Sequence, residues 1–183
     1  LCLPEESGRT LDMLQWGLVP FWAKDVRIGS RIINARAETA AEQPAYRAAF
    51  KRRRCLLPAS GYYEWKKQLH GKTPHYFSMV DGRPFGMAGL WEEWNSPDGE
   101  LLHTCSTLTT EAGPGIAVIH HRMPVILDAE AQLYWLEADP EDRTQIQSLL
   151  RPYPRDDLQA HPVSTQMNAA TWDDPSCIEP VLN

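Results

Sequence analysis

The sequence lacks the features that would assign it to a membrane, secreted or metal-binding class. No apolar run approaches the roughly 18 residues that span a bilayer, and the first residues lack the basic and then apolar pattern of a secretory signal. The four cysteines, Cys2, Cys55, Cys105 and Cys177, form no Cys-x-x-Cys pair, so neither a zinc site nor a disulfide framework is indicated. We expect a cytoplasmic protein with no membrane segment, metal or other cofactor, whose three internal cysteines are buried thiols.

The sequence also lacks internal repeats and low-complexity linkers. With 183 residues, 43% of them hydrophobic, the chain is long enough for one domain with a substantial core and short for two. We therefore expect a single domain over residues 1–183. Oligomeric state leaves no trace in the sequence, and a monomer is the default expectation.

Short strands outnumber helices in the pattern that is present. Strands are predicted over residues 13–18, 54–58, 61–66, 75–80, 85–91, 101–108 and 124–127, with a further strand near 161–164 and turns at Asp81-Gly82 and Pro97-Asp98-Gly99. Helices are predicted over residues 44–53, over 129–137 with Asp128 as N-cap, and over 140–150 with Asp139 as N-cap. The predicted class is α+β, with a β-rich, barrel-like mixed sheet and a few peripheral helices.

Positive charge is concentrated in one third of the chain, although the formal net charge is −6. Residues 21–72 hold twelve of the eighteen Lys and Arg and four acids, which gives about +8 there and about −14 elsewhere. The densest cluster, Lys51 to Arg54, is explained equally well by the dipole of a helix end or by a phosphate contact. Arg36 and Arg122 are better phosphate candidates, because each lies in a short polar segment between apolar residues.

Glu64 lies within the aromatic run Gly61-Tyr62-Tyr63-Glu64-Trp65. A carboxylate that aromatic rings keep from water has a raised pKa, which suits it to proton transfer near neutral pH. The alternative is a solvent-facing glutamate that pairs with Lys66 or Lys67, and for an isolated strand glutamate this alternative is favoured.

Two further polar segments have both a functional and a structural explanation. Asn34 and Arg36 would project to one side of an extended segment, or Asn34 would cap a helix entrance. His120, His121 and Arg122 lead into an apolar strand, where imidazole suits proton transfer and, less well, metal binding, because adjacent histidines point in different directions. Thr109 and Thr110 lie ahead of them, next to residues typical of a turn.

Seven segments, in this order and at this spacing, carry a resemblance to a known family. They are WGLVPFWAKD (16–25), INARAET (33–39), CLLPASGYYEWKK (55–67), MAGLWEEW (87–94), STLTTEAG (106–113), IHHRMPVIL (119–127) and HPVS (161–164). Together they resemble the SRAP (SOS response-associated peptidase) family of abasic-site processing proteins, over about residues 11–181.

The resemblance implies binding to single-stranded DNA and a covalent reaction with an abasic site. In the family, an N-terminal cysteine exposed by autoproteolytic removal of the initiator Met forms a thiazolidine with the aldehyde of the ring-opened sugar. Asn34 would then orient sugar oxygens, Glu64 would move protons, and His120 would assist ring opening. The DNA would be held by Arg36 and Arg122 at phosphates, by Thr109 at the backbone, and by Trp16, Trp22 and Trp65 as stacking surfaces, with core packing as the favoured alternative for at least two of these tryptophans. The implied location is the bacterial cytoplasm, at the nucleoid.

The N-terminal part of the sequence departs from the family pattern. Family members begin Met-Cys-Gly-Arg and continue for several tens of residues before the WGLVP-like segment, whereas here Trp16 follows almost at once. The segment around Cys2 resembles the strand and turn that precede WGLVP. We therefore expect that Cys2 is not the nucleophile, and that the nucleophile and one phosphate-binding arginine lie outside residues 1–183. The alternative function is a truncated or degenerate relative that binds single-stranded DNA without covalent chemistry, with a metal-dependent hydrolase at His120 and His121 a distant third.

Overall fold

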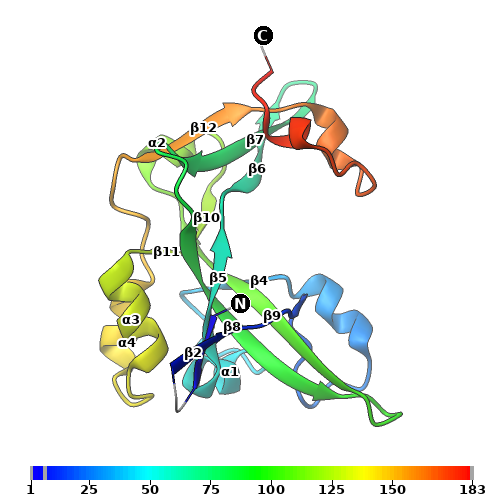
Figure 1. The fold of residues 1–183 in the computed structure, drawn as a ribbon, viewed down its shortest axis with the longest axis vertical. Helices are drawn as coiled ribbons and strands as arrows, with labels where there is room; N and C mark the ends of the chain where they lie inside the picture. Colours follow the sequence, from blue (N-terminus) through cyan, green and yellow to red (C-terminus); the bar gives the residue numbers. More distant parts are fainter. Residues whose placement is uncertain (1, 6–7, 182–183) are drawn as a thin grey trace.

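The computed structural model describes residues 2–5 and 8–181, and its strands form two sheets (Figure 1). The larger sheet has nine described strands in the order β10-β9-β8-β5-β1-β2, with β11 paired to β8 and with β3 and β4 paired to β9. These strands are β1 (Cys2–Glu5), β2 (Gly8–Leu11), β3 (Gln15–Trp16), β4 (Asn34–Arg36), β5 (Arg54–Ala59), β8 (Phe85–Asn95), β9 (Leu101–Glu111), β10 (Arg122–Pro124) and β11 (Ile126–Leu127). Most pairs are antiparallel, whereas β3 and β4 run parallel to β9, so the sheet is mixed.

The smaller sheet is antiparallel and lies above the larger one in Figure 1. Its strands, in order, are β12 (Leu158–Pro162), β7 (Gly71–Met79) and β6 (Tyr62–Gln68). β6 follows β5 after two residues, so the chain passes directly from one sheet to the other at Ser60 and Gly61. A Cβ on Gly61 would lie 2.4 Å from the Phe77 carbonyl oxygen and 2.3 Å from the Tyr76 ring, so this crossing requires glycine.

Both turns predicted from the sequence are present, but only the turn at Gly99 closes a hairpin, between the paired strands β8 and β9. Gly82 joins β7 of the smaller sheet to β8 of the larger one, and these two strands do not pair with each other. Gly82, between β7 and β8, and Gly99, between β8 and β9, have φ values of 72° and 85°. Such positive φ values are accessible to glycine without steric cost, which is why Asp-Gly pairs signal turns. The predicted strand at 13–18 shortens to β3, because Gly17 turns away from the sheet with φ 117° and packs its backbone against Gly29.

The described helices are short. They are α1 (Arg47–Arg52), α2 (Pro114–Ala117), α3 (Ala129–Glu137) and α4 (Arg143–Leu149), together with the 3-10 segments η1 (Val26–Arg31), η2 (Thr165–Asn168) and η3 (Pro175–Ile178). The main core lies between the sheet and α1, α3 and α4, and includes Leu56, Leu90, Leu108, Trp135 and Ile146. Trp135 is fully buried and its indole N–H donates to the Cys55 carbonyl oxygen at 2.8 Å, so α3 is fixed against β5. None of the described helices is long and apolar enough to cross a bilayer.

The predicted helix ends are confirmed for α3 and wrong for α4. Asp128 caps α3, because its carboxylate accepts from the Ala131 N–H at 3.0 Å. Asp139 instead accepts from the Glu141 N–H and closes a turn of its own, so α4 begins four residues later than Asp139, with Asp142 in the N-cap position. The α+β class with a β-rich mixed sheet is confirmed, and the strand order of the larger sheet has two ends, β10 and β2, and is not a closed ring.

Two expectations about individual side chains need correction, and one about the backbone is confirmed. Cys55 and Cys105 are buried as expected, whereas Cys177 is partly exposed, because η3 lies at the surface. Arg54 is buried and donates to the carbonyl oxygens of Trp135 (2.7 Å), Phe50 and Ala138, so it joins α1 and α3 and is unavailable to a phosphate. The strand expected at Cys2 is confirmed on the backbone, where Cys2 pairs with Leu11 and Leu56.

Candidate functional site

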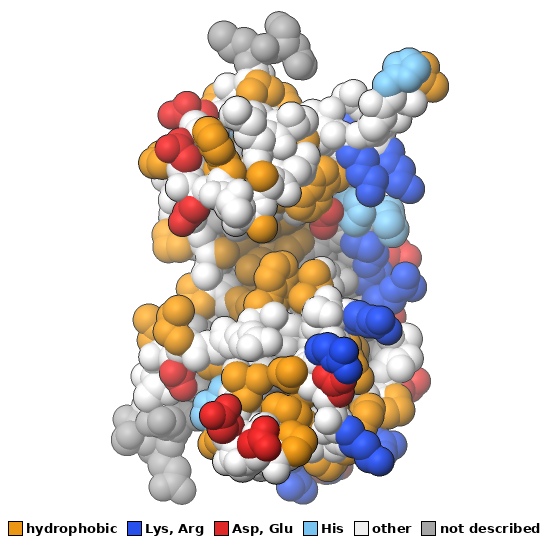
Figure 2. All heavy atoms as spheres, turned by 90° about the vertical axis from the view of Figure 1, so that its right-hand side faces the viewer, with side chains coloured by type: hydrophobic (Ala, Val, Ile, Leu, Met, Phe, Trp, Pro, Cys, Tyr) orange, Lys and Arg blue, Asp and Glu red, His pale blue; other side chains and the backbone are white. Residues whose placement is uncertain are grey.

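A cleft of about 420 Å³ separates the two sheets and collects most of the predicted site residues. Figure 2 shows a hollow with a hydrophobic floor between the upper and lower parts of the molecule, and Lys and Arg side chains along one side of this face. Five of the eight predicted site residues line the cleft: Trp16, Asn34, Glu64, Trp65 and Thr109. The other lining residues are Leu57, Pro58, Gly61, Tyr62, Tyr63, Met87, Thr107 and Pro124.

Glu64 faces the cleft from β6 and lies beside His120. Its Oε2 atom is 3.2 Å from His120 Nδ1, and the two side chains are 20% and 30% exposed. Burial raises the pKa of Glu64, and the nearby His120 only partly offsets this. The raised pKa predicted from the aromatic surroundings is confirmed, and the alternative in which Glu64 is a surface residue paired with a lysine is wrong. A carboxyl group and an imidazole at this distance can exchange a proton.

The backbone of Arg122 fixes the orientation of the His120 ring. His120 Nδ1 lies 3.0 Å from the Arg122 carbonyl oxygen and 3.3 Å from the Arg122 backbone nitrogen. When Nδ1 carries a proton it donates to the carbonyl oxygen or to Glu64, and when it does not it accepts from the N–H. Both protonation states of His120 therefore have a hydrogen-bond partner in the same ring orientation, which suits a group that gains and loses a proton.

Asn34 and Arg36 are presented by β4 in the extended conformation, so the helix-entrance alternative is wrong. β4 pairs in parallel with β9, with Asn34 opposite Thr107 and Arg36 opposite Thr109. The intervening Ala35 is buried, and both flanking side chains are exposed on the other side of the strand. The Asn34 amide therefore faces the cleft. Arg36 lies two residues further along β4, on the same side of the strand, and it forms no ion pair with any described residue.

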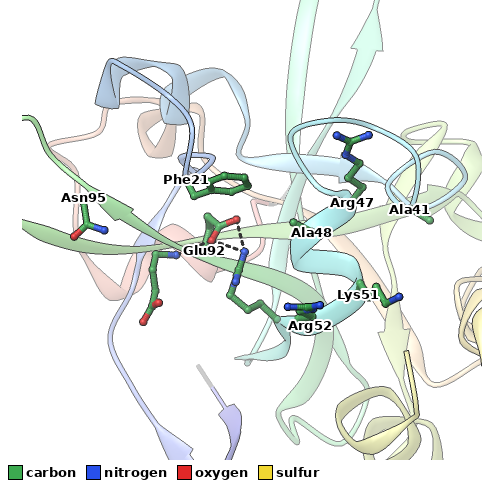
Figure 3. A pocket seen from close by; sticks show the side chains of 10 residues that line it. Phe21, Ala41, Arg47, Ala48, Lys51, Arg52, Glu92 and Asn95 are labelled. Carbon is green, nitrogen blue, oxygen red and sulfur yellow. Dashed lines mark hydrogen bonds and ion pairs between the residues drawn. The ribbon is translucent and has the colours of Figure 1, made fainter. Parts of the chain in front are cut away.

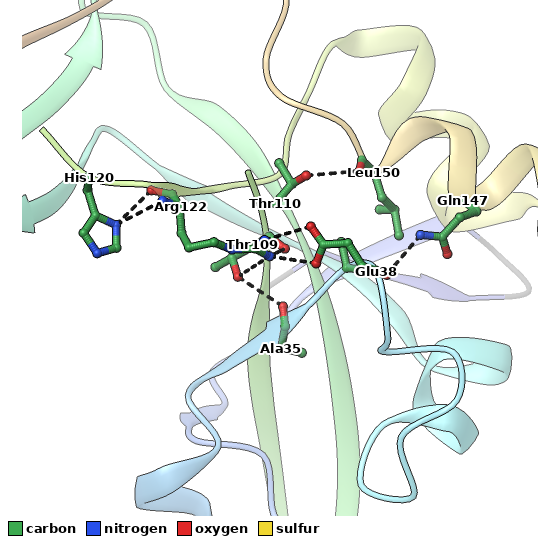
Figure 4. Close-up of polar contacts among 9 residues, drawn as sticks. Ala35, Glu38, Thr109, Thr110, His120, Arg122, Gln147 and Leu150 are labelled. Atoms are coloured by element: carbon green, nitrogen blue, oxygen red, sulfur yellow. Dashed lines mark hydrogen bonds and ion pairs between the residues drawn. The ribbon is translucent and has the colours of Figure 1, made fainter. Parts of the chain in front are cut away.

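Arg122 already has an internal partner, which sequence reasoning missed. Its Nη1 and Nη2 atoms donate to the two carboxylate oxygens of Glu38 at 2.8 and 2.9 Å, and Nη2 also donates to the Thr109 carbonyl oxygen at 2.5 Å (Figure 4). The Arg122 side chain is largely buried, while Glu38 remains partly exposed. The Arg122 guanidinium lowers the pKa of Glu38, which keeps its carboxylate charged at neutral pH. An incoming anion would have to compete with Glu38 for Arg122.

Trp16 and Trp65 line the cleft from opposite sheets, and each has its indole N–H anchored. Trp16 donates to the Ile33 carbonyl oxygen at 2.9 Å, and Trp65 donates to the Asn168 side-chain oxygen at 2.8 Å. Trp16 is 56% exposed and Trp22 is 50% exposed, although Trp22 does not line the cleft. The expectation that at least two of these three tryptophans pack in the core is therefore wrong. Trp16 and Trp65 are held as fixed flat surfaces within the cleft.

Several cleft residues were missed because their proximity arises from pairing between distant segments. Tyr62 and Tyr63 were noted only as neighbours of Glu64, and Thr107 and Met87 were not singled out. Asn168 comes from η2, more than 100 residues after Trp65 in the chain. The one sequence signal that could have identified Glu38 is its position within INARAET, two residues after Arg36.

Metal ligation has no support in the described part of the chain, where no three His, Cys, Asp or Glu side chains gather in a suitable arrangement. The rings of His120 and His121 lie 4.6 Å apart and are tilted by 48°, so they contact each other, and the expectation that the two side chains point in different directions is wrong. The cleft therefore combines the Glu64 carboxyl group, an amide and two aromatic surfaces, while His120 contacts Glu64 without lining the cleft itself.

Comparisons with known proteins agree on one family. The sequence model of the family described as "SOS response associated peptidase (SRAP)" matches residues 2–170. The abasic site processing protein YoqW of Bacillus subtilis is 43% identical over 175 residues, covering 94% of this chain and 78% of YoqW. The abasic site processing protein HMCES of Gallus gallus is 32% identical over 201 residues, covering 97% of this chain and 59% of HMCES.

Solved structures show the same fold. A crystal structure of a Bacteroides thetaiotaomicron protein matches with a TM-score of 0.85 at 32% identity, covering 92% of this chain and 76% of the other. A second, from Bordetella bronchiseptica, matches with a TM-score of 0.79 at 31% identity, covering 89% and 82%. The fold around the cleft is therefore shared with proteins that have been solved experimentally.

Proposed function

Because this chain belongs to the SOS response associated peptidase (SRAP) family, we propose that it binds single-stranded DNA and processes abasic sites within the cleft between its two sheets. The names of its relatives support abasic-site processing as the general activity. The contact between Glu64 and His120 at 3.2 Å, at a cleft that Asn34 also lines, is the observation that carries the proposal.

Opening an abasic sugar ring requires coordinated proton transfer. A base removes the proton from the C1 hydroxyl group, the bond between C1 and the ring oxygen breaks, and an acid protonates that oxygen to leave an aldehyde and a hydroxyl group. His120 assists this step and Glu64 exchanges the proton with it. The Asn34 amide donates to a sugar oxygen and orients the ring.

The covalent step in the intact family member uses an N-terminal cysteine, whose amine and thiol add to the aldehyde and release water to form a thiazolidine. Glu64 moves the protons of imine formation and of its reversal. Cys55, Cys105 and Cys177 do not line the cleft. Burial also raises the pKa of Cys105 to about 11, which keeps its thiol protonated and unreactive.

Residues that line the cleft, or that lie against its lining residue Thr109, would hold the strand on either side of the lesion. Arg36 is exposed and free to contact a phosphate, and Thr109 lies beside it on β9. In the DNA complex, Arg122 contacts a phosphate in place of its ion pair with Glu38. Trp16 and Trp65 present rings on which bases stack, a contact worth roughly 1–3 kcal/mol per base.

The test compares single-stranded oligonucleotides of the same sequence with and without one abasic site. We expect tighter binding of the abasic strand in a native gel, and loss of that preference in Asn34→Ala. A denaturing gel of the same reactions reports the covalent product. Equal affinity of the wild-type protein for both strands would contradict abasic-site recognition and leave the second candidate, a single-stranded DNA-binding module without lesion chemistry, which the charge of residues 21–72 favours.

A further inference from the structure

A second cavity, of about 750 Å³, lies against α1 and shares no lining residue with the cleft. Figure 3 shows it from close by, with the Phe21 ring beside Glu92 and with Arg47, Lys51 and Arg52 along α1. We call it the α1 pocket, defined by its lining residues: Phe21, Ala41, Arg47, Ala48, Lys51, Arg52, Arg53, Glu92, Glu93 and Asn95.

The charges of the α1 pocket leave an excess of cations after internal pairing. Arg53 forms a 2.6 Å ion pair with the buried Glu92, and Lys51 pairs at 2.6 Å with Glu141, which lies outside the pocket. Arg47 and Arg52 are exposed, and no acidic side chain among the described residues lies within ion-pair distance of either. Two guanidinium groups are therefore free to bind an anion.

The Arg53–Glu92 pair gives the α1 pocket a fixed base. Arg53 donates from Nη2 to Glu92 at 2.7 Å, and the backbone N–H of Glu93 donates to the other Glu92 oxygen at 3.0 Å. The Arg53 Nε atom is buried with no partner among the described residues, and an unsatisfied donor of this kind is destabilising until an acceptor binds.

Phe21 adds an aromatic surface next to these cations. Its ring is 59% exposed, although the residues just before it, Gly17 to Pro20, are buried. The adjacent Trp22 is also half exposed, and neighbouring exposed apolar side chains mark a contact site where a single one would not. An exposed ring beside two unpaired guanidinium groups fits a ligand that joins a flat base to a phosphate.

We propose that the α1 pocket binds a nucleotide, and that the nucleotide belongs to the DNA strand that leaves the cleft. Trp16 lines the cleft and Phe21 lines the α1 pocket, five residues later in the chain. Five residues span at most about 18 Å, which limits the distance between the two cavities. At about 3.4 Å per nucleotide along one strand, this distance corresponds to about five nucleotides. The inference rests on the proposed function. A free nucleotide has the same chemistry as a nucleotide within the DNA strand, so the test distinguishes these two ligands.

The first arm of the test measures affinity for single-stranded oligonucleotides of 5 and 15 nucleotides. We expect Arg52→Glu and Phe21→Ala each to weaken binding of the 15-mer at least threefold and to change binding of the 5-mer less than twofold. Arg151→Glu is the matched control, because Arg151 is exposed, has no ion pair in the described structure and lies outside both cavities. Unchanged circular dichroism and thermal midpoint establish that each variant is folded.

The second arm measures binding of free dAMP to the same variants. Weakened binding of the 15-mer supports the strand as the source, whereas dAMP binding that Arg52→Glu removes, with no effect on the 15-mer, supports a free nucleotide. Equal effects of Arg52→Glu and Arg151→Glu in both arms, or no effect of either, would overturn the inference. If the wild-type protein bound neither oligonucleotide, the proposed function would fail, while the dAMP arm would still decide whether the α1 pocket binds a nucleotide.

Discussion

At the scale of single residues, Glu64 shows which properties can be predicted locally and which cannot. Its aromatic neighbours in the sequence were sufficient to predict a raised pKa, because burial can be inferred from adjacent residues. Its partner could not be inferred in this way, since His120 lies 56 positions later in the chain and reaches Glu64 only through the packing of both sheets. The resemblance to a family, and not any local pattern, grouped the two residues in advance.

Under the proposed function, Glu64→Gln should reduce formation of the covalent product with abasic DNA at least tenfold, because the amide cannot carry a proton between His120 and the sugar. The folded-state pKa of Glu64 is raised, so the wild-type protein loses stability as pH rises from the unfolded-state pKa towards the folded-state pKa. Glu64→Gln has no ionisable group at this position, so it does not lose stability in this way as pH rises. Its thermal midpoint relative to wild type should therefore increase between pH 4 and pH 7, and a constant difference across that range would contradict the burial of an ionising Glu64.

Glu38→Gln should tighten binding of single-stranded DNA several-fold, because Arg122 is then released from a charged internal partner that competes with phosphate. The pKa of Glu38 is lowered, so its contribution to stability is present above the unfolded-state pKa and is lost as pH falls through the folded-state pKa. The stability cost at pH 7 should be about 1 kcal/mol or less, since the carboxylate is partly exposed and screened.

Glu42→Gln is the matched control for Glu38→Gln. It removes the same charge from a nearby exposed residue that pairs with Arg143, away from the cleft. If both variants tightened DNA binding equally in a fluorescence anisotropy titration, the effect would reflect general repulsion, and the proposed competition at Arg122 would be wrong.

At the scale of helices and strands, the predictions from the sequence were wrong where two local sequence patterns competed. Residues 33–39 contain both a helix-entrance pattern and an extended pattern, and pairing of β4 with β9 decided between them. Asp139 and Asp142 are both plausible caps, and Asp139 closes a separate turn at Glu141. Strand centres and the α3 boundaries were predicted correctly because alternation and a single unambiguous cap agreed there.

Replacing Asp128 or Asp139 with alanine should distinguish, by the loss of stability, the aspartate that caps a helix from the one that does not. Asp128→Ala should lower the free energy of unfolding by about 1 kcal/mol, because the Ala131 N–H loses its acceptor. For a protein of this size, that corresponds to a fall of about 2–4 °C in the thermal midpoint. Asp139→Ala, which removes no helix cap, should cost less, and an equal or larger loss in that variant would show that the cap assignment is incorrect.

At the scale of the whole molecule, the cleft depends on the arrangement of two sheets that the sequence does not specify locally. The α+β class and most strands were predictable from alternation and turn residues, whereas the division into a large and a small sheet depends on pairings between distant segments such as β12 with β7. The distribution of charge was predictable, and one side of the cleft face carries Lys and Arg side chains despite the net charge of −6.

Binding of single-stranded DNA should therefore weaken with salt although the protein is acidic overall. If Arg36, Arg122 and Arg52 each neutralise one phosphate, the logarithm of the association constant should fall with the logarithm of salt concentration with a slope of about −2. Titrations of a 15-mer between 50 and 200 mM salt would measure this slope. A slope near zero would exclude phosphate contacts as a main source of affinity.

The hydrogen bond from Trp65 to Asn168 has a consequence for protein synthesis. One wall of the cleft is made of β6, but its tryptophan is anchored by a residue that the ribosome adds more than 100 positions later, after β12 has been made to pair with β7. A nascent chain that has already formed the larger sheet still lacks this anchor. The wall of the cleft at Trp65 should therefore reach its final arrangement only after translation has passed Asn168.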